Sequence, residues 1–207
     1  MAAGEPILDA APRFLVLRGG AIGDFIVTLP VLQALKARWP RADIEIWGYP
    51  HIARLAVAGG LASRVVSLDR AEMARFYVPV METTPEIEEK IRSFDLVFNY
   101  LHDPEGQIRS NLLLAGAKQV LSGSPIVKRG SASRFLLEPL MDLALYDESD
   151  VPRLDISSDR AHLARAGLPD GAPAPVALHP GSGGEAKKWP LERFFALGII
   201  EQNDAGT

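Results

Sequence analysis

Short apolar runs alternate with helical patterns along most of this chain. The apolar runs, rich in β-branched and aromatic residues, are 14–18, 44–48, 64–68, 95–100 and 119–123. The helix candidates are 22–38, 51–59, 85–93, 106–116 and 131–146. Strands that alternate with helices form βαβ units, in which a parallel sheet carries helices on both faces. The pattern therefore predicts an α/β fold of the Rossmann-like type.

This alternation is interrupted before the last part of the chain. Residues 146–157 cluster acidic residues around Pro152, residues 161–168 have a helical pattern, and residues 168–175 are rich in proline and glycine. A new apolar strand, VALH at 176–179, follows. We therefore predict one domain over 1–168, and a linker with the start of a second domain over 169–207.

Both predicted domains contain a strand, a glycine-rich turn and a helix in succession. The two units are FLVLRGGAIGDFIVTLP at 14–30 and PVALHPGSGGEAKKWPLERF at 175–194. Such a turn directs backbone N–H groups and the positive end of a helix dipole towards an anion. The first turn lacks G-x-G-x-x-G spacing, and Trp47 and Gly48 occupy the place of the ribose-binding acid. An NAD-dependent oxidoreductase is therefore disfavoured.

Asp24 directly follows Gly23 at the start of the first helix, and two interpretations apply to it. A carboxylate there complements the helix dipole and caps free N–H groups. It also stands at the carboxyl end of the first strand, where open α/β sheets bind ligands, and is available as a general base. The residue alone leaves both interpretations open.

Composition narrows the classes of function. With 47% hydrophobic and 23% charged residues in 207, the chain has an ordinary globular composition. A net charge of −4 argues against a general nucleic-acid-binding protein, which needs a basic surface. The absence of cysteine excludes disulfides and thiolate nucleophiles and fits a reducing compartment. With no signal-peptide pattern and no apolar run near the ~20 residues of a membrane span, we expect a cytoplasmic protein.

The two glycine-rich motifs resemble those of the ADP-heptose:lipopolysaccharide heptosyltransferases, which form glycosyltransferase family 9. The first resembles the family's amino-terminal signature, and HPGSGGEAKKWPLERF resembles its nucleotide-sugar loop. FDLVFNYLHDPEGQIRS, between them, is a weaker third match. The resemblance covers residue 14 to about residue 200. It implies a GT-B architecture, in which a complete amino-terminal Rossmann-like domain holds the acceptor and a second Rossmann-like domain, present here as its first βα unit, holds the nucleotide sugar.

The resemblance also implies an activity and a set of residues for it. The expected reaction is inverting transfer, without a metal or another cofactor, of heptose or a similar sugar from an ADP-sugar to a lipopolysaccharide core or other glycan acceptor. Asp24 matches the family's base. The residues matched to the acceptor are Gly20, Gly23, Arg109 and Ser110, and those matched to the nucleotide sugar are Gly181, Ser182, Gly183, Gly184 and Lys187.

Two features leave the partners open. Glu105 stands where many relatives carry Gln, so the identity of the acceptor is not determined. Lys128, Arg129 and Arg134 form a basic cluster that fits either an anionic lipid core or a solvated surface. A peripheral contact with the inner membrane surface is therefore one expectation.

The chain reaches only Thr207, shortly after the second helix, whereas relatives complete the second domain with further strands and an acidic, histidine-containing loop. We therefore expect a truncated second domain, either because the sequence is a fragment, because transferase activity has been lost, or because a partner supplies the rest. The alternative function is a non-catalytic sugar- or phosphate-binding module derived from the GT-B fold.

Overall fold

The computed structural model describes residues 8–79, 81–146, 148–155 and 188–204, with side chains of the last helix described to residue 197. It divides into two units, residues 1–160 and 161–207, and each is described by itself. The first unit holds a sheet of five parallel strands in the order β3-β2-β1-β4-β5. The strands are β1 (Arg13–Leu17), β2 (Asp43–Gly48), β3 (Arg64–Ser67), β4 (Leu96–Asn99) and β5 (Val120–Ser122). The five strands predicted between residues 14 and 123 and the parallel α/β architecture are confirmed.

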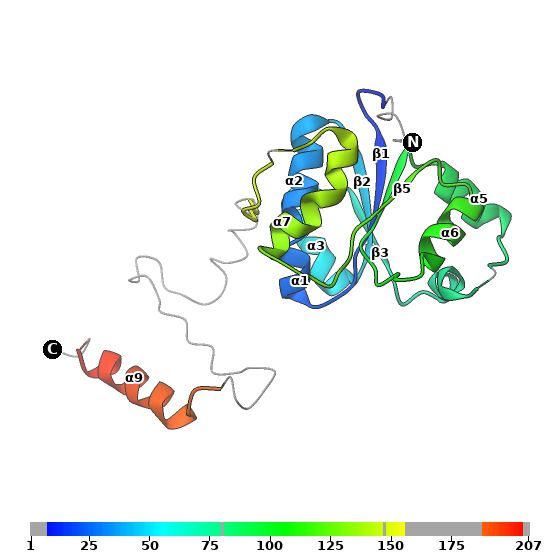
Figure 1. Cartoon of the computed structure of the whole chain (residues 1–207). Coiled ribbons are helices and arrows are strands. Elements are labelled where there is room, and N and C mark those ends of the chain that lie inside the picture. Colours follow the sequence, from blue (N-terminus) through cyan, green and yellow to red (C-terminus); the bar gives the residue numbers. More distant parts are fainter. Residues whose placement is uncertain (1–7, 80, 147, 156–187, 205–207) are drawn as a thin grey trace. The chain divides into compact units, whose positions relative to one another are not determined.

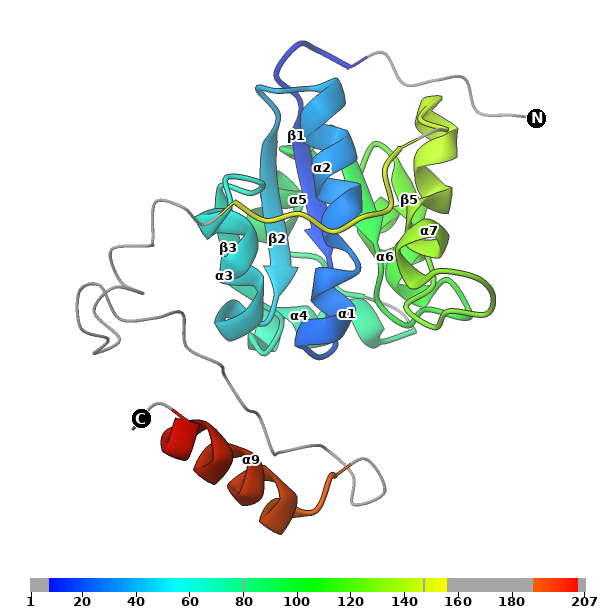
Figure 2. The same ribbon diagram turned by 90° about the vertical axis from the view of Figure 1, so that its left-hand side faces the viewer.

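Helices cover both faces of this sheet (Figures 1 and 2). One face packs against α1 (Ile22–Ile26), α2 (Leu29–Arg38), α3 (Pro50–Ala58) and α7 (Ala132–Leu137). The other packs against α4 (Ala71–Ala74), α5 (Pro85–Arg92) and α6 (Gln107–Leu114). Figure 2 shows the strands running towards the end of the sheet at which α1 lies.

Strand β1 shows why the sheet is buried on both sides. Successive strand residues point to opposite faces, so Phe14 and Val16 enter one apolar cluster while Leu15 and Leu17 enter the other. All four are at most 1% exposed, as expected for the central strand of a parallel sheet. The Phe14 ring makes edge contacts with Trp39, at 5.4 Å between centroids, and with Phe98, at 5.8 Å. The strand that positions the first glycine-rich turn is therefore held rigidly.

The predicted helix 22–38 is wrong in one respect, because it consists of two helices, α1 and α2. Pro30 has no N–H with which to bond the Ile26 carbonyl, and its ring crowds the preceding turn. The Thr28 N–H donates to the Phe25 carbonyl at 3.0 Å, which tightens the chain at the end of α1. A new helix then starts at Leu29, with proline in its first turn, where its missing donor is harmless.

Two further differences follow from local sequence. The predicted helix 131–146 is α7 followed by the 3₁₀ helix η2 (Glu138–Leu143), because Pro139 interrupts the α-helical bonding. The short helices α4 and η1 (Arg75–Tyr77) were not predicted. Met73 and Phe76, three residues apart, bury against the sheet and give the only helical signal in that segment.

The second unit contains α9 (Leu191–Asp204), which begins directly after Pro190, as predicted for the helix behind the second glycine-rich loop. Within this unit the Trp189 ring packs edge-on against the Phe194 ring, with 4.8 Å between the ring centroids. The predicted domain boundary at 168/169, the helix 161–168, the strand 176–179 and the loop residues 181–187 lie outside the described residues. Among the described helices, none is long and apolar enough to cross a membrane.

Candidate functional site at the carboxyl end of the sheet

The sheet reverses its winding between β1 and β4, and this is where open α/β sheets bind ligands. The turn that begins at Gly19 leaves the carboxyl end of β1. The segment from Tyr100 to Asp103 leaves the carboxyl end of β4 beside it, and the Tyr100 N–H donates to the Leu17 carbonyl at 2.9 Å. The first glycine-rich turn and the middle motif, distant in sequence, therefore meet at one end of the sheet.

Gly20 is required by the geometry of the turn. Its φ of +96° lies in the left-handed region, which residues with a side chain rarely adopt. A Cβ at this position would lie 2.8 Å from Asp24 Oδ2 and 2.9 Å from Asp24 Cβ. A Cβ at Gly23, by contrast, would meet no described atom within 4 Å. The close approach of the turn to Asp24 thus explains Gly20 but not Gly23, and the acceptor-binding role of both stays a prediction.

Asp24 caps the helix on which it sits. Its Oδ2 accepts a hydrogen bond from the Ala21 backbone N–H at 2.9 Å, which satisfies a donor that the first turn of α1 leaves free. The residue is exposed, and its Oδ1 makes no hydrogen bond with any residue between 8 and 155 that the structure describes. One oxygen thus orients the carboxylate of an exposed side chain, an arrangement compatible with the predicted role as a base.

Arg18, which the sequence analysis did not single out, lies beneath this turn. It is only 3% exposed, yet its guanidinium forms no salt bridge within the described part of the chain. It donates instead to two backbone carbonyls, from Nη2 to Asp24 O at 2.8 Å and from Nη1 to Tyr100 O at 3.4 Å. The guanidinium therefore joins α1 to the segment that follows β4.

The broken helix explains why the Asp24 carbonyl needs this partner. In a continuous helix that carbonyl would accept from the Thr28 N–H, but that N–H bonds Phe25 instead. The Asp24 carbonyl accepts hydrogen bonds from the Thr28 hydroxyl, at 2.8 Å, and from Arg18 in place of that N–H. A cation at the carboxyl end of a helix also complements the dipole. Burial lowers the pKa of Arg18, an effect that nearby Asp24 opposes, and an arginine remains charged in proteins.

Two cavities at this end of the sheet share Gly20 as a lining residue. The smaller, of about 210 Å³, contains Asp24 and His102, and the larger, of about 570 Å³, contains Tyr49, His51 and Asp69. Tyr49 directly follows β2, and Asp69 comes two residues after the end of β3. Both positions could have been identified from the sequence by the rule that identified Asp24, because they lie at the carboxyl ends of strands. The remaining lining residues are Arg18, Gly19, Tyr100, Leu101 and Pro125 in the smaller cavity, and Ala21, Ile22 and Ile52 in the larger.

The structure does not bring Arg109 and Ser110 into either cavity. Both are exposed in the first turn of α6, where the Arg109 N–H donates to Asp103 Oδ2 at 2.9 Å. The Ser110 hydroxyl donates back to the Gly106 carbonyl at 2.8 Å within the same helix. Their acceptor-binding role stays a prediction, and Asp103, which caps their helix, has an evident structural task.

The basic cluster of the sequence analysis is partly neutralised. Arg129 pairs with Glu138 at 3.0 Å, and Arg134 lies 3.9 Å from Asp150. Both pairs are at least partly exposed to solvent, which fits the interpretation as ordinary surface. The five residues matched to the nucleotide sugar, including Lys187, lie outside the described part of the chain.

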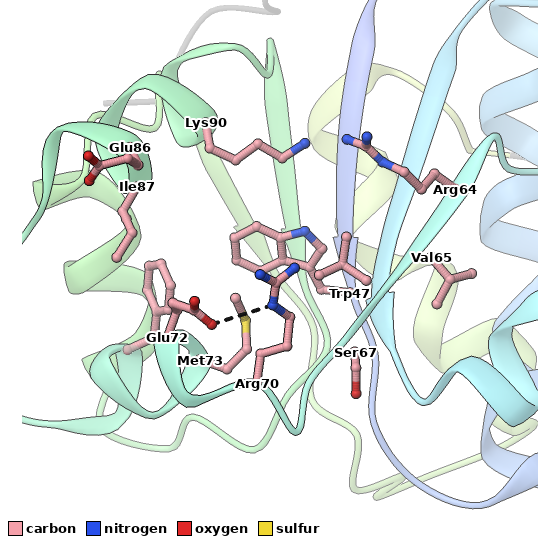
Figure 3. A pocket seen from close by; sticks show the side chains of 12 residues that line it. Trp47, Arg64, Val65, Ser67, Arg70, Glu72, Met73, Glu86, Ile87 and Lys90 are labelled. Carbon is pink, nitrogen blue, oxygen red and sulfur yellow. Dashed lines mark ion pairs between the residues drawn. The ribbon is translucent and has the colours of Figure 1, made fainter.

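A third cavity, of about 670 Å³, lies away from Asp24, between β3 and helices α4 and α5 (Figure 3). Lys90 and Arg64 point towards each other across it (Figure 3). Beneath them Glu45, with its side chain 3% exposed, accepts from Lys90 Nζ at 2.6 Å, from Trp47 Nε1 at 2.8 Å and from Arg64. The buried carboxylate thus ties β2 to β3 and to α5.

Replacing Glu45 by Gln is expected to remove part of the acid sensitivity of folding. Burial by itself raises the pKa of Glu45, but hydrogen bonds from Lys90, Arg64 and Trp47 outweigh it and hold the pKa below the usual glutamate value. Its stabilisation, about 2 kcal/mol, is therefore complete above the unfolded pKa of roughly 4.3 and is lost as the pH falls through the folded pKa.

Urea unfolding at several pH values measures this effect. Glu45→Gln is expected to be less stable than the parent at pH 7. The difference is expected to narrow as the pH falls from about 4.3, where Glu45 of the unfolded parent binds a proton, through the lower pKa of the folded carboxylate. Glu105→Gln, at an exposed position, serves as the control. A pH-independent difference would mean that Glu45 contributes by packing and not by charge.

Comparison with solved structures identifies the fold. A glycosyl transferase of family 9 from Veillonella parvula is 19% identical to the chain, with a TM-score of 0.62 over 92% of it. The E. coli heptosyltransferase WaaC with ADP is 18% identical, with a TM-score of 0.57 over 91% of the chain. E. coli ADP-heptose lps heptosyltransferase II is 16% identical, with a TM-score of 0.55 over 92%. The chain therefore shares the fold of these glycosyltransferases.

The chain matches only part of each of these solved chains. The chain spans 60%, 64% and 62% of the length of these three solved chains, respectively. No protein-family model matches the sequence, and no curated protein matches it significantly.

Proposed function

We propose that this chain belongs to glycosyltransferase family 9 and acts in the transfer of a sugar, heptose or a close analogue, from an ADP-sugar to a glycan acceptor such as a lipopolysaccharide core. The observation that carries the proposal is the exposed carboxylate of Asp24 at the topological switch point of the sheet, held there by Gly20 and Arg18. The shared fold with solved heptosyltransferases supports the class of reaction.

In the proposed reaction Asp24 acts as the general base. An acceptor hydroxyl in the cavity beside Asp24 attacks the anomeric carbon of the donor while its proton passes to the carboxylate. The new bond joins the acceptor oxygen to the anomeric carbon, the bond from that carbon to the diphosphate breaks, and the nucleoside diphosphate leaves with the bonding electrons. Because attack and departure occur on opposite sides of the carbon, the anomeric configuration inverts.

The donor is assigned to the second glycine-rich motif. Backbone N–H groups of residues 181–184 and the ammonium of Lys187 are proposed to stabilise the negative charge on the leaving diphosphate without a metal ion. One solved WaaC structure contains ADP and another contains ADP-2-deoxy-2-fluoro heptose, which supports a nucleotide-sugar donor of this type. We place the reaction in the cytoplasm, with a peripheral contact at the inner membrane where the acceptor is a lipid-linked core.

Product release tests the proposal. The protein, expressed from its complete reading frame, is incubated with ADP-heptose and a lipopolysaccharide core acceptor, and ADP is measured by anion-exchange chromatography. We expect ADP release that depends on the acceptor, together with a glycan product whose new linkage is inverted by NMR. Tight binding of ADP-heptose with no turnover under any acceptor would favour the alternative, a non-catalytic sugar-binding module.

A further inference from the structure

We infer that the acceptor group presented to Asp24 is an uncharged sugar ring, held in the larger cavity against Tyr49 and His51. Its reacting hydroxyl reaches past Gly20 to Asp24 in the smaller cavity, and its other hydroxyls are directed to Asp69. This inference rests on the proposed function and specifies the acceptor for the same site. It concerns the cavity of about 570 Å³ that shares Gly20 with the cavity of Asp24. Its volume falls within the range of small-molecule sites.

The cavity is built by three neighbouring strand ends. Gly20 follows β1, Tyr49 follows β2 and Asp69 follows β3, and adjacent parallel strands place these residues along one edge of the sheet. Tyr49 also packs against the glycine-rich turn, since a Cβ on Gly19 would lie 3.9 Å from its ring. The wall of the cavity is therefore attached directly to the segment that carries Asp24.

The aromatic pair in this wall suits a sugar ring. The rings of Tyr49 and His51 are 6.0 Å apart between centroids, with 30° between their planes, so they present two roughly aligned faces. The C–H groups of a pyranose form an apolar face that packs on such rings, whose negative faces attract polarised hydrogens. Tyr49 is half-buried and His51 is exposed, so both remain accessible at the cavity.

The charges in the two cavities select against an anion. The carboxylates there are Asp24 and Asp69, and both are exposed. Among the described lining residues of the two cavities the one arginine or lysine is Arg18, whose buried guanidinium is already bonded to two carbonyls. A sugar carboxylate or phosphate near Asp69 would meet repulsion, whereas uncharged hydroxyls donate hydrogen bonds to it.

Saturation-transfer NMR at low ionic strength tests the inference with two probes of the same ring, methyl β-D-glucopyranoside and its uronic-acid counterpart, methyl β-D-glucuronide. We expect the neutral glycoside to bind at least about fivefold more tightly than the anionic one, because Asp69 repels the carboxylate. Tyr49→Ala is expected to weaken the binding of the neutral probe at least about fivefold. Asp69→Asn is expected to reduce the preference for the neutral probe.

Matched controls are available in the same unit. Tyr146→Ala, at a tyrosine that is 61% exposed and lines a different pocket, and Asp142→Asn, at an exposed aspartate, are expected to leave both affinities unchanged. Equal binding of the two probes, binding of neither, or a Tyr49→Ala protein that binds like the parent would overturn the inference.

This experiment separates the inference from the proposed function, because it contains no donor and needs no turnover. A protein that binds the neutral probe but never transfers a sugar would refute the proposed function and leave the sugar site standing. A protein that transfers sugar solely to anionic acceptor rings would refute the neutral-sugar site and leave the transferase standing.

Discussion

Asp24→Asn is expected to lower the rate of sugar transfer by a factor of about 10²–10⁴, the usual contribution of a general base. The amide cannot take the acceptor proton at neutral pH. Its carbonyl oxygen can still accept the Ala21 N–H, which Asp24 Oδ2 accepts at 2.9 Å in the parent, so helix α1 keeps its cap. The rate is measured as acceptor-dependent ADP release, and circular dichroism checks that folding is unchanged.

Two further variants define what a loss of rate means. Asp24→Ala removes both the base and the cap, so it is expected to lose the same activity and about 1 kcal/mol of stability as well. Asp142→Asn changes an exposed aspartate on η2 and is expected to transfer sugar at the parent rate. If Asp24→Asn were as fast as the parent, Asp24 would be a cap only, and the proposed mechanism would have to be abandoned.

Arg18→Met is expected to lower the free energy of unfolding by about 2–4 kcal/mol. The methionine fills much of the buried volume but leaves the carbonyls of Asp24 and Tyr100 without the donors that Arg18 supplies at 2.8 and 3.4 Å. Because those bonds hold α1 against the segment after β4, transfer activity is expected to fall as well. Urea unfolding followed by tryptophan fluorescence measures the first effect, since Trp39 and Trp47 lie in the two apolar clusters of this unit.

Two more variants test whether Arg18 acts through the several N–H donors of its guanidinium: the conservative Arg18→Lys and a surface control. Arg18→Lys keeps a cation but cannot span both carbonyls, so we expect a stability between those of Arg18→Met and the parent. Arg41→Met, at an exposed position, is expected to change stability by at most about 0.5 kcal/mol. An Arg18→Met protein as stable and as active as the parent would show that the buried guanidinium does not position α1.

The strands were predictable because their signal is local. Each is a short apolar run bounded by polar or turn residues, and β1 is apolar at every position from Phe14 to Leu17, as a strand buried on both faces requires. The break between α1 and α2 was also visible as Pro30, but the apolar pattern on either side of it continues in helical phase and predicts one helix. Helices α4 and η1 were missed because seven residues carry too little periodicity to distinguish them from a loop.

Part of the candidate site was likewise predictable from the sequence, and part of it was not. The sequence by itself determined the alternation of strands and helices, the glycine-rich turn after β1 and the acid that follows it, since each depends on residues close together in the chain. The tertiary structure alone decided that Arg18 reaches the carbonyls of Asp24 and Tyr100, and that Tyr49 and Asp69 share a cavity with Gly20. These contacts join residues up to 82 positions apart, and they exist because strand order places β2, β3 and β4 around β1, an arrangement set by the packing of helices on both faces of the sheet.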